Sequence, residues 1–184
     1  MTQIKINYQY EIMLLLLKKE MHGREITKEL KTSLTRVQSA LNDLRNMNIL
    51  DYKVEGKNHV YFIKKNLVSK SAILNAENYK LAKILDKHPE LEPIFQDIIS
   101  KSKCSLILLF GSYAKGNERK ESDIDIYIET TNQTIKDYAQ KIHGLLSVKI
   151  GKFNTDDLLI KEIIKNHAII KGGEEYYEKI KFFN

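Results

Sequence analysis

The chain has 184 residues, which is longer than a typical single domain but too short for two large ones, so two small units are expected. Its composition, with 42% hydrophobic and 29% charged residues and only 8 Gly and 2 Pro, excludes the collagen-like and low-complexity classes and favours a helix-rich globular protein. The single cysteine, Cys104, excludes an intrachain disulfide and a cysteine-cluster zinc site. A chain without disulfides is typical of the reducing cytoplasm. No apolar run is long enough to cross a membrane, and the N-terminal run lacks the pattern of a signal peptide.

The net charge of +6 is unevenly distributed. Residues 1–70 hold 13 basic and 7 acidic side chains, a net charge of +6, whereas residues 71–184 hold 17 of each sign. Positive charge confined to one unit is typical of a module that binds a polyanion such as nucleic acid. The alternative is a general preference for lysine, because 26 of the 30 basic residues are Lys.

The first unit begins with a predicted helix over residues 8–20 and a short second helix over residues 24–30. A third helix is predicted after the pair Thr32-Ser33, whose hydroxyls suit an N-cap. Apolar residues then follow at helical spacing and predict one buried stripe, made of Leu34, Val37, Leu41 and Leu44. Residues 51–55 and 58–63 alternate polar and apolar side chains around Gly56-Lys57, which predicts a two-stranded hairpin.

Three helices and a hairpin in this order resemble the winged helix-turn-helix of MarR-like and ArsR-like transcription regulators over residues 8–65. The resemblance implies that the third helix enters the major groove of double-stranded DNA and that the hairpin, the wing, contacts the flanking backbone. If the apolar stripe faces inward, the predicted DNA-binding side chains on the third helix are Ser33, Thr35, Arg36, Gln38, Ser39 and Asn42. Lys57 and His59 at the wing tip complete the set, and Arg36 suits guanine. The alternatives are a merely solvated helix face or a protein-docking module.

A helical connector is predicted next, with helices over residues 71–87 and 91–101 interrupted at His88-Pro89. These helices either pack within the second unit or form the seam of a homodimer. The expected fold class is therefore α/β overall (α+β). Its predicted domains are a winged helix-turn-helix over residues 1–70, the connector over 71–102, and a mixed-sheet domain over 103–184.

The third segment, residues 103–184, contains the residues that indicate a chemical function. A short apolar run over residues 105–110 ends at Gly111-Ser112, and residues 122–128 then alternate strictly. In a strand this alternation places Asp123 and Asp125 on one face. Two such carboxylates suit Mg²⁺, which binds through one or two carboxylates and substrate phosphates, and a glycine at a strand end lets backbone approach a phosphate. Taken singly, each feature is more often a solvent-facing strand or an ordinary turn.

Together, the stretch from Leu109-Phe110-Gly111-Ser112 to Ser122-Asp123-Ile124-Asp125 resembles the motif of the DNA polymerase β-type nucleotidyltransferase superfamily, and in particular its minimal members. The resemblance covers residues 103–173. It implies a mixed sheet flanked by helices, and a nucleoside triphosphate, expected to be ATP, bound with Mg²⁺ at Asp123 and Asp125. It also implies phosphates held by Gly111 and Ser112, with Lys115 available to pair with phosphate charge.

One residue departs from the family's pattern. The family supplies a third carboxylate from the strand after the next helix, and here a helix over residues 134–146 is followed by a strand over 147–153 that contains no acid. Lys149 occupies the expected position. Two consequences stay open. In the first, Lys149 replaces the charge of one metal ion, which leaves a site that binds nucleotide but transfers it slowly or not at all. In the second, Asp156 or Asp157 reaches back to the site and supplies the third carboxylate. A helix over 155–167, a strand over 168–171 and a helix over 173–183 complete the predicted fold.

Three functional hypotheses follow from these patterns. The first is an enzyme that transfers a nucleotidyl group to a protein, a small molecule or a nucleic acid. The second is a catalytically weak, nucleotide-sensing transcription regulator. The third is an antitoxin-like nucleotidyltransferase with a toxin partner. The sequence favours a DNA-binding protein that binds Mg-nucleoside triphosphate, and it leaves catalysis open because the third carboxylate was not found.

Overall fold

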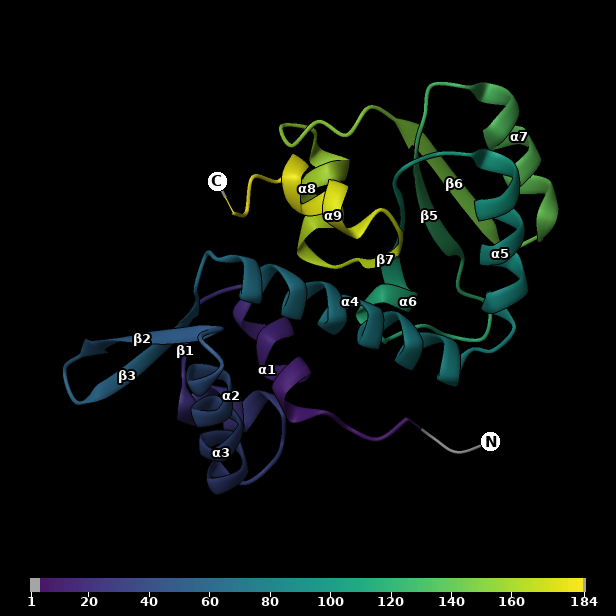
Figure 1. Cartoon of the computed structure of the whole chain (residues 1–184). Helices are drawn as coiled ribbons and strands as arrows, with labels where there is room; N and C mark the ends of the chain where they lie inside the picture. The colour runs from purple at the N-terminus through teal and green to yellow at the C-terminus, as the bar shows by residue number, and fades with distance from the viewer. Residues whose placement is uncertain (1–3, 184) are drawn as a thin grey trace. The chain divides into compact units, whose positions relative to one another are not determined.

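The structure is a computed structural model that describes residues 4–183 (Figure 1). The chain divides into two compact units, Met1–Tyr79 with Phe183–Asn184, and Lys80–Phe182. Helix α4 (Leu67–Lys87) begins in the first unit and ends in the second. The predicted α/β fold class is confirmed. None of the helices in the described residues is both long and apolar enough to span a bilayer.

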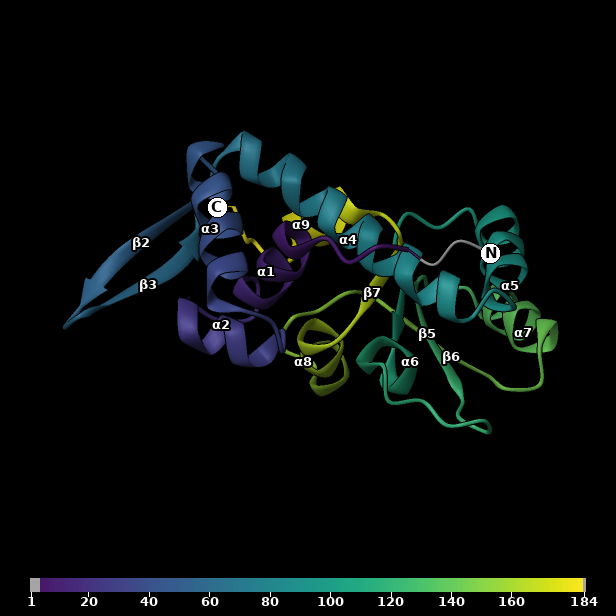
Figure 2. The same cartoon turned by 90° about the horizontal axis from the view of Figure 1, so that it is seen from below.

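The first unit combines helices with a three-stranded sheet. Its elements before α4 are α1 (Tyr8–Leu16), β1 (Met21–His22), α2 (Gly23–Glu29), α3 (Leu34–Asn46), β2 (Leu50–Glu55) and β3 (Asn58–Ile63). Strands β1, β3 and β2 form an antiparallel sheet in that order, and the β2–β3 hairpin extends away from the three helices (Figure 2). The short strand β1 was not predicted, because two residues are too few to show an alternating pattern.

Helix α3 forms as its sequence predicts. The Ser33 side chain caps its first turn by accepting a hydrogen bond from the Arg36 backbone N–H at 3.3 Å. Val37, Leu41 and Leu44 are buried in the first unit's core, but Leu34 is 37% exposed. The prediction that Leu34 belongs to the buried stripe was wrong, because this residue lies in the first turn of the helix and the core covers it only partly.

The second unit is a four-stranded mixed sheet with helices. Its remaining elements are α5 (Leu91–Ser102), β4 (Ile107–Phe110), α6 (Gly111–Lys115), β5 (Ile124–Glu129), α7 (Gln133–Ile142), β6 (Leu146–Gly151), α8 (Leu158–Lys165), β7 (Ala168–Lys171) and α9 (Gly173–Lys179). The strand order is β6-β5-β4-β7. Only the β5–β6 pair is parallel among these strands, and α7 makes the crossover between its two members.

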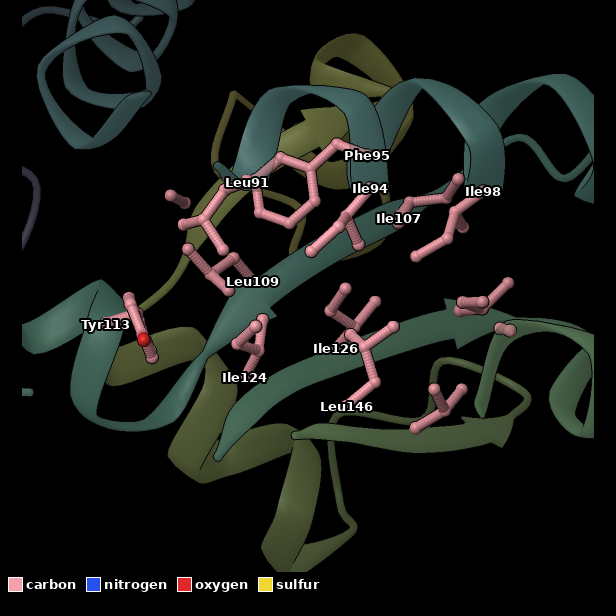
Figure 3. Packing of buried hydrophobic residues seen from close by; sticks show 14 of the residues in the cluster. Leu91, Ile94, Phe95, Ile98, Ile107, Leu109, Tyr113, Ile124, Ile126 and Leu146 are labelled. Carbon is pink, nitrogen blue, oxygen red and sulfur yellow. The ribbon is translucent and has the colours of Figure 1, made fainter. Parts of the chain in front are cut away.

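One face of this sheet packs on α5 and α7. Leu91, Ile94, Phe95 and Ile98 project from α5 onto alternate residues of the central strands (Figure 3). Side chains two apart in a strand lie on the same face of the sheet. The sheet residues buried on this face are Ile107, Leu109, Ile124, Ile126, Ile128, Leu146 and Val148. The alternating apolar pattern predicted for residues 122–128 is therefore the core-facing side of β5.

The other face lies toward α8 and α9 (Figure 1). The ring of Tyr127 packs edge-on against Phe153, and Phe153 packs against Tyr176 of α9, with ring centroids 6.1 and 5.9 Å apart. The Tyr127 hydroxyl donates to the Gly151 carbonyl at 2.9 Å. Burial raises the pKa of this hydroxyl well above its ordinary value, so it stays a neutral donor. Both faces of β5 are thus covered at its C-terminal half, and the face that carries Asp125 is less buried at its N-terminal end.

Several predicted boundaries differ from the structure. The helix predicted over residues 134–146 ends at Ile142, because His143 is extended and Gly144 favours a turn, and Leu146 begins β6. The helix predicted from residue 155 begins at Leu158. Helix α4 begins at Leu67, four residues before the predicted start. The predicted domain limits at residues 70 and 102 remain predictions.

Candidate functional site

The two motif carboxylates lie at the start of β5. Asp123 is exposed and directly precedes the strand, and Asp125 is partly buried within it. Ile124 and Ile126 are buried in the core beside them, which fixes the orientation of the strand. In the antiparallel β4–β5 register Asp125 pairs with Phe110, the residue before Gly111. The predicted carboxylate strand and the predicted Gly-Ser turn therefore meet at one edge of the sheet.

The backbone conformation and the close packing at residue 111 require a glycine. Gly111 has a φ of +70°, and a Cβ atom added to it would lie 2.1 Å from Oδ2 of Asp125. Real Cβ atoms do not approach an oxygen so closely, so a side chain at this position would push the carboxylate away. The missing side chain lets the Asp125 carboxylate lie against the backbone at the start of α6, where Ser112 follows.

The charge of Asp125 is set by four neighbours. Burial is the largest influence and raises the pKa of the carboxyl group, and a hydrogen bond from the Ser147 side chain lowers it. The charges of Asp123 and Glu162 raise the pKa, and the ammonium group of Lys149 lowers it. The net pKa is raised. An anionic Asp125 is therefore less stable here than in water, and an added cation would stabilise it.

Lys149 lies on the same side of the sheet as Asp125. In the parallel β5–β6 register Asp125 pairs with Ser147 and Tyr127 pairs with Lys149, so both β6 side chains project to the carboxylate face. Val148, between them, is buried in the core on the opposite face. The Lys149 ammonium group is close enough to act on the charge of Asp125. The residue at the predicted third-ligand position is therefore a cation whose charge acts on Asp125.

Lys115, predicted to bind phosphate, is the last residue of α6. Its Nζ atom donates a hydrogen bond to Oε1 of Glu162 on α8 at 3.3 Å. Both side chains are substantially exposed, Lys115 at 37% and Glu162 at 59%. Such a pair is weakly held, so its members are available to other partners.

Asp156 and Asp157 do not join the carboxylate pair. Both are exposed and lie at the start of α8, where Asp157 occupies the N-cap position without making a side-chain cap hydrogen bond. Among residues 4–183, no three His, Cys, Asp or Glu side chains lie close enough together to hold a metal ion. Asp123 and Asp125 alone still suit Mg²⁺, which accepts one or two carboxylates and completes its shell with water and substrate phosphates.

The loop between α6 and β5 is fixed by a buried acid. The Glu118 side chain is 7% exposed, accepts a hydrogen bond from Lys87 and lies 2.9 Å from Nε2 of His88. Burial acts to raise the pKa of Glu118, but the hydrogen bonds from Lys87, a backbone N–H and His88, together with the charge of Lys87, outweigh it and the net pKa is lowered. The ring of Tyr113 packs edge-on against His88 at 5.0 Å. The loop and α6 are thus both anchored to the residues that end α4.

The predicted DNA-binding residues of α3 form one exposed face. Ser33, Thr35, Arg36, Gln38, Ser39 and Asn42 are all exposed. The Arg36 guanidinium group donates from Nη1 to Thr32 Oγ1 at 3.0 Å and to the Tyr8 hydroxyl at 3.3 Å. It also lies 5.0 Å from the centre of the Tyr8 ring. Arg36 is therefore held at the N-terminal end of the helix rather than extended into solvent.

The wing presents rings and basic groups on one face. His59 stacks on Tyr52 with centroids 4.0 Å apart, and the guanidinium of Arg45, near the end of α3, lies 4.5 Å from the Tyr52 ring centre. Lys57 is exposed at the tip beside Gly56, which has a φ of +61°. The predicted α3 and wing residues thus all lie in the first unit, and the predicted nucleotide residues all lie in the second.

Glu162 and Ser147 were missed by sequence reasoning. Glu162 is 37 positions beyond Asp125 and shows no motif, so only the packing of α8 reveals its proximity. It is the single acidic residue in the eight-residue helix α8, which is a weak signal at best. Ser147 follows from the parallel register opposite Asp125, which a sequence pattern does not fix.

Comparison with known proteins places this geometry in context. The family model described as "Polymerase beta, Nucleotidyltransferase" matches residues 80–176, slightly more than half of the chain. Two similar proteins of Methanocaldococcus jannaschii are named as candidate protein adenylyltransferases. MJ1379 is 30% identical over 102 residues, which cover 52% of this chain and 90% of the relative. MJ0128 is 35% identical over 96 residues, which cover 50% of this chain and 86% of the relative.

A solved structure also shows partial similarity. A point mutant of ZitR from Lactococcus lactis has 21% sequence identity and a TM-score of 0.38, and the match covers 56% of this chain and 74% of that chain. A TM-score at this level does not establish a shared fold. The element order and sheet pairing of the first unit are those that the predicted winged helix requires, and the winged helix stays a prediction.

Proposed function

Because the chain belongs to the polymerase β nucleotidyltransferase family, we propose that its second unit transfers a nucleotidyl group from ATP to a hydroxyl group of a protein. The observation that carries the proposal is the approach of the Asp125 carboxylate to the side-chain-free backbone of Gly111, which joins the two halves of the motif. The names of the relatives MJ1379 and MJ0128 support a protein acceptor and an adenylyl group. The lone, buried Cys104 favours the cytoplasm as the site of this activity.

The chain's own residues divide the work of binding. The backbone of Gly111 and Ser112 and the ammonium group of Lys115 hold the triphosphate, because they combine close backbone approach with positive charge. Asp123 and Asp125 hold Mg²⁺, which when bound neutralises phosphate charge. Glu118 keeps the intervening loop in place through Lys87 and His88. Transfer itself is mainly positioning and charge neutralisation.

Lys149 makes the transfer slow. Its ammonium group supplies a fixed single positive charge on the carboxylate side of β6, where a third carboxylate would support a second metal ion. A fixed +1 charge stabilises the transition state less than a divalent ion does. The same observation favours a second candidate function, in which the site senses Mg-nucleotide and rarely transfers it.

The first unit binds double-stranded DNA. This part of the proposal is supported by the exposed polar face of α3, by the rings and basic groups of the wing, and by the net charge of +6 within residues 1–70. The third helix reads base edges and Lys57 contacts the phosphate backbone. The protein thus combines a DNA-binding unit with a nucleotide-handling unit.

Labelled transfer tests the enzymatic proposal. The full chain is incubated with α-labelled ATP, Mg²⁺ and a cell extract, and labelled protein is measured after gel separation. We expect slow labelling that a metal chelator abolishes and that Asp123→Asn removes. Labelling at the wild-type rate by Asp123→Asn would contradict the proposed site, and binding of ATP without any labelling would favour the sensor instead.

A further inference from the structure

We propose that Glu162 is the base of the transfer reaction: its carboxylate takes the proton of the acceptor hydroxyl group as that oxygen attacks the α-phosphorus. This inference rests on the proposed function, because it assigns a role within the same site. It supplies the acidic group that β6 lacks, and it takes that group from α8 rather than from a strand.

The position of Glu162 carries the first step of the argument. Its carboxylate contacts Lys115, the lysine of the phosphate-binding segment, at 3.3 Å, and its charge acts on Asp125. Glu162 therefore lies near both the proposed phosphate-binding segment and the carboxylate strand. Asp156 and Asp157, which the sequence suggested as replacements, lie at the start of α8 and have no such contact with Lys115 in the described structure.

Exposure and charge favour a base over a metal ligand. The Glu162 side chain is 59% exposed, so a protein acceptor can reach it from solvent. It forms no metal-holding group with Asp123 and Asp125 within residues 4–183. Lys149 already supplies a cation on the carboxylate face, which opposes the entry of a second metal ion there. What the site then lacks is a proton acceptor.

The contact with Lys115 couples the base to nucleotide binding. Before ATP binds, the Lys115 ammonium group donates a hydrogen bond to the Glu162 carboxylate. The pair is exposed and therefore weak, and a triphosphate carries several negative charges, so Lys115 exchanges Glu162 for phosphate oxygens. Binding of ATP therefore shifts Lys115 toward the phosphates and leaves the Glu162 carboxylate without this partner. Nucleotide binding thus favours the state in which Glu162 can accept the proton of the acceptor.

The chemical step balances without another reactant. The acceptor oxygen forms a bond to the α-phosphorus, and the bond from that phosphorus to the β-phosphate oxygen breaks, with its electron pair leaving on pyrophosphate. The hydroxyl proton moves to Glu162 and is later lost to solvent. Nothing is oxidised or reduced.

Chemical rescue tests this role. The full-length Glu162→Ala variant is compared with wild type in the labelled-ATP assay with cell extract, with and without added sodium formate. We expect transfer to fall about 100-fold or more, as general-base loss does, and formate to restore at least about a tenth of the lost rate because it fits the space of the missing carboxylate. Asp156→Asn, an exposed acid of the same segment, serves as the matched control and should keep the wild-type rate. Because Glu162 is exposed, truncating it leaves the core intact, and Glu162→Gln gives a second variant of nearly unchanged shape.

A binding measurement separates the alternatives. Calorimetry with Mg²⁺ and a non-hydrolysable ATP analogue should give the same affinity for wild type and Glu162→Gln within about threefold. Three outcomes would overturn the assignment of Glu162 alone: transfer by Glu162→Ala at the wild-type rate, a slow variant that formate does not rescue, or a tenfold loss of nucleotide affinity in Glu162→Gln, which indicates a binding role. Absence of transfer by the wild-type chain would overturn the proposed enzymatic function as well.

Discussion

Two residues far apart in the motif meet at the candidate nucleotide site, because one of them has no side chain. Gly111 and Asp125 are separated by the whole loop that follows α6, yet the carboxylate oxygen fills the space where a Cβ atom of residue 111 would lie. Their meeting follows from the antiparallel pairing of Phe110 with Asp125. The spacing between Gly-Ser and Asp-x-Asp in the sequence therefore reflects this strand register.

Gly111→Ala should therefore destabilise both the fold and nucleotide binding. A left-handed conformation at a residue with a side chain costs about 1 to 2 kcal/mol, and the displaced carboxylate adds to this. Gly116→Ala is the matched control, since Gly116 has a φ of +72° and a Cβ atom there would meet nothing within 4 Å. Urea unfolding and calorimetry with an ATP analogue check both variants. Equal losses of nucleotide affinity in the two would show that the contact with Asp125 is unimportant.

The proposed metal-binding role of the motif carboxylates gives a second prediction. Asp123→Asn or Asp125→Asn should weaken Mg-nucleotide binding by about 1.5 to 3 kcal/mol, because each removes a charged partner of the cation. Calorimetry with and without a chelator measures the change, and Asp137→Asn on the exposed side of α7 is the control. Nucleotide affinity that is unchanged in both motif variants would mean that the carboxylates merely face solvent.

Lys149 gives the third prediction at this scale. Lys149→Asp should raise transfer about tenfold or more, because it adds a carboxylate to the face that carries Asp125, whereas Lys149→Ala should not. Lys152→Asp makes the same charge change just beyond β6 and serves as the control. The result is measured as label transferred from ATP per minute. Fast wild-type transfer that disappears in Asp156→Ala or Asp157→Ala would show that the third acid is one of these two.

At the scale of elements, sequence periodicity predicted most helices and strands of both units. It succeeded where burial is one-sided, as for Val37, Leu41 and Leu44 on α3 and for the isoleucines of β5, because one-sided burial imposes a period. It failed at ends and at very short elements, such as β1 and the C-terminus of α7, where tertiary pairing decides. The candidate site divides in the same way: its motif residues were predictable, and Glu162, which depends on how α8 packs, was not.

The α3 helix and the wing carry the DNA-binding prediction. Arg36→Ala should weaken specific DNA binding by about 1 to 3 kcal/mol, and Lys57→Ala should weaken binding to all sequences alike and reduce the salt slope by roughly one unit. Thr32 and Tyr8 already hold the Arg36 side chain, which lowers the cost of ordering it. Arg24→Ala, on the exposed side of α2, makes the same charge change and is the control. Gel-shift titrations at several salt concentrations supply the data. An Arg36→Ala effect no larger than that of Arg24→Ala would contradict base recognition by α3.

At the scale of the whole molecule, the excess positive charge and the nucleotidyltransferase motif lie in separate units. The net charge of +6 belongs to residues 1–70, and the remaining chain is balanced at 17 basic and 17 acidic residues. The unit with the nucleotide motif therefore does not attract polyanions through its overall charge, and we expect its phosphate binding to depend on a few local groups. Composition counted over the full chain hides this division.

Deleting residues 1–65, which ends just before α4, should therefore abolish DNA binding. The full chain, the deleted chain and a full chain with Arg36 and Lys57 both changed to Ala are compared by gel shift at low salt, where charge-driven binding is strongest. We expect the double variant to lie between the other two. Retention of DNA binding by the deleted chain would place the DNA-binding surface in the second unit.

The strand order β6-β5-β4-β7 has a consequence for how the second unit assembles. Pairing β4 with β5 closes a loop of fewer than twenty residues, whereas pairing β4 with β7 joins Ile107 to Lys171 across more than sixty. Longer loops lose more chain entropy on closure and form contacts more slowly. During synthesis, β4 and β5, the strand pair that brings Gly111 to Asp125, leave the ribosome before α8 and β7. We therefore expect the candidate nucleotide site to form early in folding, and Glu162 on α8 to join it later.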